Sequence, residues 1–199
     1  MKRAIEIILD PGRAAVLVDP MRREIVRLLA ESEKTQNELA KLLGLSDPSV
    51  GHHLNLLRER GLVRIVRKEA EEHGILQKFY EATAYVFLID SRKMPREIER
   101  YFMPIALERA RSIVSVVSVM SNGTDAITAE ELEEFAKIVS STIIDVAKKF
   151  TKPWVGTREE LLAKIYRNAL DKFIAKPDLL PKPVNSYFAK AHAFRLNTY

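Results

Sequence analysis

The sequence contains no cysteine, which excludes disulfide bonds, thiolate metal ligands and a cysteine nucleophile together. Histidine is also scarce, and only His52 and His53 are neighbours in the sequence, far from His73 and His192. Adjacent residues on a helix point about 100° apart, so such a pair rarely binds one metal ion. We therefore expect no metal site.

Long apolar segments are absent as well. No run approaches the ~18 to 20 residues that span a bilayer, and Glu6 interrupts the short apolar stretch behind the basic start of the chain, unlike a signal peptide. The sequence has no glycine-rich phosphate loop and neither a Gly-x-Ser-x-Gly nor a His-Glu-x-x-His motif. We therefore expect a cytoplasmic protein with no membrane segment, no enzymatic activity and no cofactor.

The composition is that of a globular protein, with 47% hydrophobic and 30% charged residues among 199, enough for one large or two small cores. The net charge of +5 permits a nucleic-acid partner without requiring one. Positive charge is concentrated in residues 58–68, where five basic residues stand against Glu59. The few glutamines and the many charged residues are typical of proteins from thermophiles.

Three helices are predicted in the first half of the chain. Asp19 and Pro20 are typical of a helix start, and helical spacing follows at Ile25, Leu28 and Leu29. Thr35 and Glu38 form a capping-box pattern for a second helix, whose predicted apolar face is Leu39, Leu42 and Leu43, and which Gly44 ends. A third helix is expected over 46–60, with an inner face of Val50, Leu54 and Leu57. The short link 44–46 between the last two predicts a helix-turn-helix.

A β-hairpin is expected directly after this unit. Residues 62–68 read as a strand, 71–74 as a turn and 75–85 as the returning strand. Three helices followed by a hairpin predict a winged helix. Because side chains alternate along a strand, Arg64 and Arg67 are expected on opposite faces.

From residue 95 onward, apolar residues recur at helical spacing, with a predicted kink at Pro104 and capping boxes at Thr128 and Thr157. The predicted fold is therefore mainly α with a small β-hairpin: a winged helix-turn-helix domain over 1–92 and a helical region over 93–199.

The helical faces of this second region favour a homodimer, although packing within one chain would also explain them. A further alternative is a cavity for a small apolar effector, lined by Phe102, Phe135, Phe150, Trp154 and Phe173.

Several motifs together resemble one family. They are Asp19-Pro20-x-Arg22-Arg23-x-Ile25-x-x-Leu28-Leu29, Thr35-x-x-Glu38-Leu39-Ala40, Leu45-Ser46-x-x-Ser49-Val50-x-x-His53-Leu54-x-x-Leu57 and Gly61-Leu62-Val63. Residues 12–85 resemble the ArsR-like (arsenic-repressor type) winged-helix regulators, and 78–84 resemble archaeal members with an extra C-terminal helical region. The resemblance implies a transcription regulator that binds double-stranded DNA. Its metal-sensing members keep a cysteine pair in the helix that here spans 36–43, so we expect no metal sensing.

In a helix-turn-helix, the second helix enters the major groove. Its predicted outward residues, which we expect to contact DNA, are Ser46, Pro48, Ser49, His52, Asn55 and Arg58. Gly51 is interpreted as allowing close approach to the groove. Four hairpin residues are expected to contact phosphates: Arg67, Lys68, Lys78 and Tyr80. His53 is interpreted either as a further phosphate contact or as a bridge to the domain core.

An alternative function is a winged helix that contacts protein within a transcription assembly, without specific DNA binding. The acidic wing tip 69–72 favours this alternative, because a wing that touches phosphate is expected to be basic there.

Overall fold

The computed structural model describes residues 2–70, 76–123, 125–150 and 152–196, with side chains to residue 190. The chain divides into two compact units. The first contains residues 1–89, 93–98 and 150–161, and the second contains 90–92, 99–149 and 162–199. The sequence predicted one boundary after residue 92, whereas in this division residues 150–161 cluster with the first unit.

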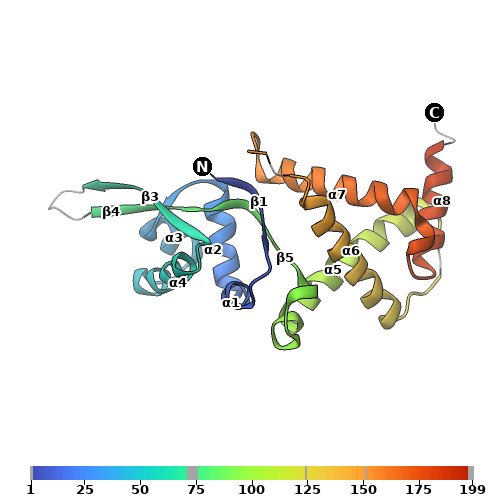
Figure 1. Cartoon of the computed structure of the whole chain (residues 1–199), viewed down its shortest axis with the longest axis horizontal. Coiled ribbons are helices and arrows are strands. Elements are labelled where there is room, and N and C mark those ends of the chain that lie inside the picture. The colour runs from blue at the N-terminus through green and yellow to red at the C-terminus, as the bar shows by residue number, and fades with distance from the viewer. Residues whose placement is uncertain (1, 71–75, 124, 151, 197–199) are drawn as a thin grey trace. The chain divides into compact units, whose positions relative to one another are not determined.

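The first unit contains the three predicted helices and a shorter helix ahead of them (Figure 1). They are α1 (Pro11–Val16), α2 (Pro20–Glu31), α3 (Gln36–Leu43) and α4 (Asp47–Glu59). Asp19 caps α2 by accepting hydrogen bonds from two backbone N–H groups, and Thr35 and Glu38 form the predicted capping box of α3. Gly44 ends α3 with φ 64°, a left-handed conformation that glycine adopts at no steric cost.

The strands of the first unit form two sheets. They are β1 (Arg3–Ile8), β2 (Lys34–Thr35), β3 (Val63–Ala70), β4 (Leu76–Ala82) and β5 (Ala84–Ile89). An antiparallel sheet has the order β2-β4-β3, and its β3–β4 pair is the predicted wing. The end predicted for the returning strand, at residue 85, was wrong. The strand β4 ends at Ala82, and after Thr83 the chain continues as β5, which pairs in parallel with β1.

Of the residues in the predicted apolar faces of the helix-turn-helix, Leu42 alone is exposed, and Leu28 and Leu43 are half-buried. Ile25, Leu29 and Leu39 are buried, as is the inner face of α4. Leu42 was predicted to join this core but is 60% exposed. The inner side of α3 is set by Leu39 and Ala40, and Leu42 lies about 200° around the helix from Ala40, so it points to solvent.

The second unit is helical. It contains most of α5 (Arg96–Met120), α6 (Ala129–Ala147), most of α7 (Arg158–Ala175) and α8 (Val184–Leu196). Helix α5 continues through Pro104, and α8 occupies the tail that the sequence left unassigned. Phe135, Phe173 and Phe188 pack together, with ring centroids 5.8, 6.2 and 5.7 Å apart. Within the described ranges, no helix has both the length and the apolar character to cross a membrane.

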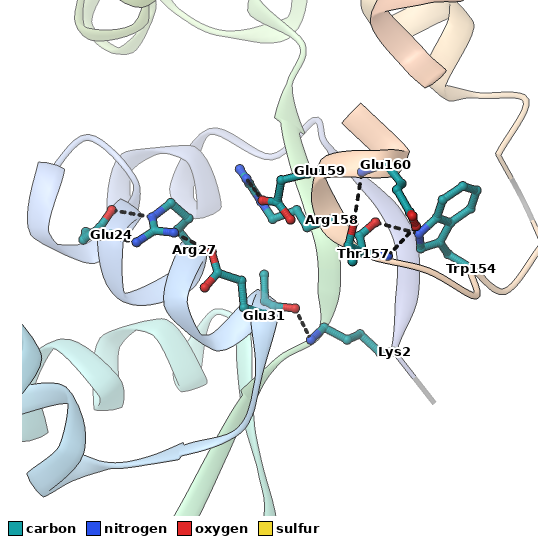
Figure 2. Close-up of polar contacts among 10 residues, drawn as sticks. Lys2, Glu24, Arg27, Glu31, Trp154, Thr157, Arg158, Glu159 and Glu160 are labelled. Atoms are coloured by element: carbon teal, nitrogen blue, oxygen red, sulfur yellow. Dashed lines mark hydrogen bonds and ion pairs between the residues drawn. The ribbon is translucent and has the colours of Figure 1, made fainter. Parts of the chain in front are cut away.

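The aromatic residues predicted to line an effector cavity are distributed over both units. Phe135 and Phe173 belong to the second unit, whereas Phe150 and Trp154 belong to the first. The first unit also holds the start of α7, where Trp154 donates a hydrogen bond to the Thr157 carbonyl (Figure 2). In the same close-up, Arg27 of α2 binds the carboxylates of Glu24 and Glu31.

Candidate nucleic-acid interface

Helix α4 presents one face to the core and the other to solvent. Its N-cap Ser46 accepts a hydrogen bond from the Ser49 backbone N–H at 3.4 Å. His52, Asn55 and Arg58 are exposed at i, i+3 and i+6, so they lie along the outer side of the helix. Ser46 and Pro48 at its start are exposed too, and Ser49 is half-buried. The residues predicted to read bases therefore share one accessible surface.

Gly51 has a role inside the helix-turn-helix. A Cβ atom added at Gly51 would lie 3.0 Å from the side-chain amide nitrogen of Gln36. That nitrogen donates a hydrogen bond to the Asp47 carbonyl at 2.7 Å, which ties α3 to the start of α4. The absence of a side chain at Gly51 thus makes room for the hydrogen bond between Gln36 and Asp47. This bond was not predicted from the sequence.

His53 acts electrostatically on Asp19, the N-cap of α2. Its side chain is half-buried, and its Nδ1 atom is buried without a hydrogen-bond partner in the described part of the chain. Burial by itself would raise the pKa of the nearby Asp19 carboxyl. Backbone hydrogen bonds from Arg22 and Met21, together with the charges of Arg22 and His53, outweigh the burial, so this pKa is lowered. This position fits the core-bridging interpretation of His53 better than a phosphate contact.

The wing contains a β-bulge that changes which residues share a face. Arg64 pairs with Glu81 and Arg67 pairs with Phe79, with the register shift at Val66 between them. Glu81 and Phe79 are two residues apart in β4, so they lie on the same face. The prediction that Arg64 and Arg67 lie on opposite faces was therefore wrong, because the extra residue of a bulge resets the alternation.

Arg67 is held by groups of the protein itself. Its Nε donates to Glu33 Oε1 at 2.6 Å, its Nη1 pairs with Glu69, and its guanidinium carbon lies 3.3 Å from the centroid of the Phe79 ring. Glu33 lies in the turn before β2, so this cluster links the base of the wing to the helix-turn-helix. Two carboxylates already balance the charge that the sequence assigned to a phosphate contact.

The opposite face of the wing is basic. Lys68 and Lys78 are directly opposite each other across β3 and β4, and both are exposed. Neither forms an ion pair with any residue that the structure describes. Like charges in this arrangement repel each other, so an anion bound between the two lysines would relieve the repulsion.

Tyr80 lies on the same face of β4 as Lys78, two residues closer to the domain core. It is only 5% exposed, so the predicted contact between this side chain and DNA is at odds with its position. Burial raises the pKa of Tyr80, and the positive charge of Arg58 partly opposes this effect. The charge of Arg58 at the end of α4 thus acts on a residue that shares a face of β4 with Lys78. We call Arg58, Lys68 and Lys78 the basic strip.

Metal binding has no visible basis in the described ranges, where no three His, Asp or Glu side chains are grouped as ligands. His73 and the side chain of His192 lie outside those ranges. We predict that zinc and cadmium bind no specific site, because the described residues hold no tetrahedral ligand set and the chain has no cysteine. Calorimetry would contradict this prediction if it showed submicromolar binding of one ion per chain.

Two comparisons with known proteins cover the helix-turn-helix. Residues 19–64 match the family described as "Bacterial regulatory protein, arsR family". The chain is also similar to the transcriptional repressor SdpR of Bacillus subtilis (strain 168), with 38% identity over 50 residues. This match covers 25% of the chain and 56% of SdpR, so the chain spans about half the length of that relative. The family match runs from the cap of α2 to the second residue of β3. Residues 19–64 thus match an ArsR-family helix-turn-helix domain, which lies within a winged-helix fold in this chain.

Proposed function

We propose that the chain is a sequence-specific, DNA-binding transcription regulator that acts as a homodimer, with α4 in the major groove. The observation that carries the proposal is the exposed face of α4, in the segment that matches the ArsR family. The relative SdpR is named as a transcriptional repressor. A regulator of this kind works where the DNA is, which agrees with the expected cytoplasmic location.

The proposed contacts divide into two kinds. Asn55 can make a bidentate contact with adenine, and His52 can donate to or accept from base edges. Ser46, Pro48 and Ser49 at the start of α4 lie where such helices approach the bases. The basic strip is proposed to bind phosphates, which fix the register without reading the sequence. Tyr80 and Arg67 are left out, because one is buried and the other is already paired.

Salt dependence distinguishes these roles on the wing. Lys68→Ala and Lys78→Ala are each expected to weaken cognate and random DNA equally, and to reduce the slope of log affinity against log salt by about 0.9. Arg67→Ala is expected to leave that slope unchanged, since its charge is neutralised within the protein. Fluorescence anisotropy titrations at several salt concentrations measure all three. A slope reduced by Arg67→Ala and not by the lysine variants would reverse the assignment.

The homodimer is supported by α5. The large apolar residues exposed along this helix include Tyr101, Ile105, Val116 and Val119. Between the first two and the last two, Glu108 and Arg111 form an ion pair. If two copies of α5 run antiparallel about the turn 108–112, Tyr101 lies opposite Val119 and Ile105 opposite Val116. Glu108 of each copy then lies near Arg111 of the other. The stripe is thus complementary to itself in both apolar character and charge.

A dimer also suits the proposed reading of DNA. Two reading helices about 34 Å apart are needed to bind a palindrome in successive major grooves. A small reader gains that spacing from a separate dimerisation region. The alternative that the aromatic residues line a cavity for a small apolar effector stays untested, and calorimetry with hydrophobic ligands would test it.

The competing function is a winged helix that contacts protein. The acidic wing tip favoured it, but Glu69 pairs with Arg67 in the structure, and Glu71 and Glu72 lie outside the described residues. A mobility shift with DNA from upstream of the protein's own coding sequence, at 150 mM salt with excess random competitor, separates the two functions. A complex that survives the competitor supports the regulator. A complex that the random competitor removes completely favours the protein-contact module.

A further inference from the structure

A buried carboxylate lies in the N-terminal strand, away from the proposed DNA contacts. The side chain of Glu6 in β1 is 5% exposed, and burial of a charge is costly unless the charge is paired. Three groups surround it: the Arg13 guanidinium at 2.5 Å, the Arg3 guanidinium at 3.3 Å and the Thr83 hydroxyl at 3.3 Å. The proposed contacts with DNA use none of these residues.

Arg13 connects this carboxylate to the end of α4. Its Nε donates a hydrogen bond to the Arg60 carbonyl oxygen at 2.9 Å, and Arg60 is the C-cap of α4. A cation at this position is favourable, because the last carbonyls of a helix lack partners and carry partial negative charge. One guanidinium therefore holds both the buried carboxylate and the end of the proposed reading helix.

The short helix α1 fixes Arg13 in place. Asp10 caps α1 by accepting a hydrogen bond from the Arg13 backbone N–H at 2.8 Å. At Gly12, an added Cβ atom would lie 3.2 Å from Nη1 of Arg60, so α1 approaches the end of α4 closely. The chain after α4 is held as well, because the Thr83 hydroxyl lies 2.9 Å from the Gly61 carbonyl oxygen.

We propose that Glu6 and Arg13 are positioning residues for α4, which fix the end of the helix and raise sequence specificity without touching DNA. This inference rests on the proposed function. Base contacts tolerate displacements of only about 0.5 Å or 10–20°, whereas long lysine side chains reach phosphates from several positions. Loosening the end of α4 therefore weakens the base contacts of this helix, whereas the wing lysines and the long side chain of Arg58 still reach phosphates.

The test compares Arg13→Ala with a matched control, Arg3→Ala. Both arginines pair with the same carboxylate, but Arg3 has a side chain that is 63% exposed, and none of its contacts in the described residues reaches α4. The DNA is a duplex enriched by the wild-type protein from a random library, with a scrambled duplex beside it. Arg13→Ala is expected to weaken the enriched duplex about tenfold, the usual worth of a hydrogen bond to a charged group. Scrambled DNA and the salt slope should not change, and Arg3→Ala should stay within about twofold.

Glu6→Gln provides a second variant. It keeps a hydrogen-bond acceptor and removes the charge that orients Arg13, so we expect an intermediate loss of about threefold on the enriched duplex alone. Circular dichroism melts show that each variant is folded at the assay temperature. If Arg13→Ala is unfolded, Glu6→Gln decides the question with the same measurements.

Three outcomes separate the possibilities. Equal losses on both duplexes with a shallower salt slope would make Arg13 a phosphate contact and overturn the proposal. Binding by the folded Arg13→Ala or Glu6→Gln variants that matches the Arg3→Ala control would overturn it too. A wild-type protein that enriches no duplex would instead refute the proposed function, which is a distinguishable failure.

Discussion

His52→Ala and Asn55→Ala are each expected to weaken binding to the cognate duplex by ~1 to 3 kcal/mol, about 5- to 150-fold. Both side chains are exposed on the outer face of α4, so their removal leaves the buried inner face unchanged. Binding to random DNA should stay nearly constant, since phosphate contacts dominate it. Titrations of both duplexes at one salt concentration measure the difference.

The control for this pair is Leu42→Ala. Leu42 is exposed on the neighbouring helix α3, and its replacement alters no charge and no proposed contact. It should bind both duplexes as the wild type does. If His52→Ala and Asn55→Ala change cognate and random binding alike, α4 does not read the bases.

The double substitution Val116→Glu and Val119→Glu is expected to convert the dimer into a monomer. Both side chains are exposed on α5, and in the proposed antiparallel pair each introduced carboxylate would lie against Tyr101 or Ile105 of the other copy, where burying an unpaired charge is costly. Binding to a palindrome should fall by 100-fold or more, because linked half-site readers gain about 10² to 10⁴ in affinity. Light scattering at micromolar concentration gives the mass, and titration gives the affinity.

The matched control is Leu179→Glu, since Leu179 is an exposed apolar residue of the same unit outside α5. This variant should remain dimeric. A wild-type monomer would refute the homodimer. A dimer that survives the double substitution would place the interface on another surface.

Local features of the fold could be predicted from the sequence. A cap or capping box depends on residues three positions apart, so Asp19, Thr35, Ser46 and Thr128 marked four helix starts correctly. The inner face of α4 followed from helical spacing for the same reason. Both features depend on a single element, without knowledge of what packs against it.

Features that depend on distant partners could not be predicted. The parallel pairing of β1 with β5 joins residues about 80 positions apart, such as Arg3 and Ala84. Glu33 neutralises Arg67 from 34 positions away. The bulge at Val66 has no glycine or proline to indicate it, so alternation placed Arg67 on the wrong face.

The most direct test of the central claim is selection from a library of random DNA duplexes by the wild-type protein at 150 mM salt. The proposed function predicts enrichment of an inverted repeat whose half-site centres lie about 10 base pairs, or a multiple of that spacing, apart. It also predicts binding at least about 10³-fold tighter than to scrambled DNA. A library that stays random after repeated rounds, or one bound equally well by a protein with His52→Ala and Asn55→Ala, would contradict the claim.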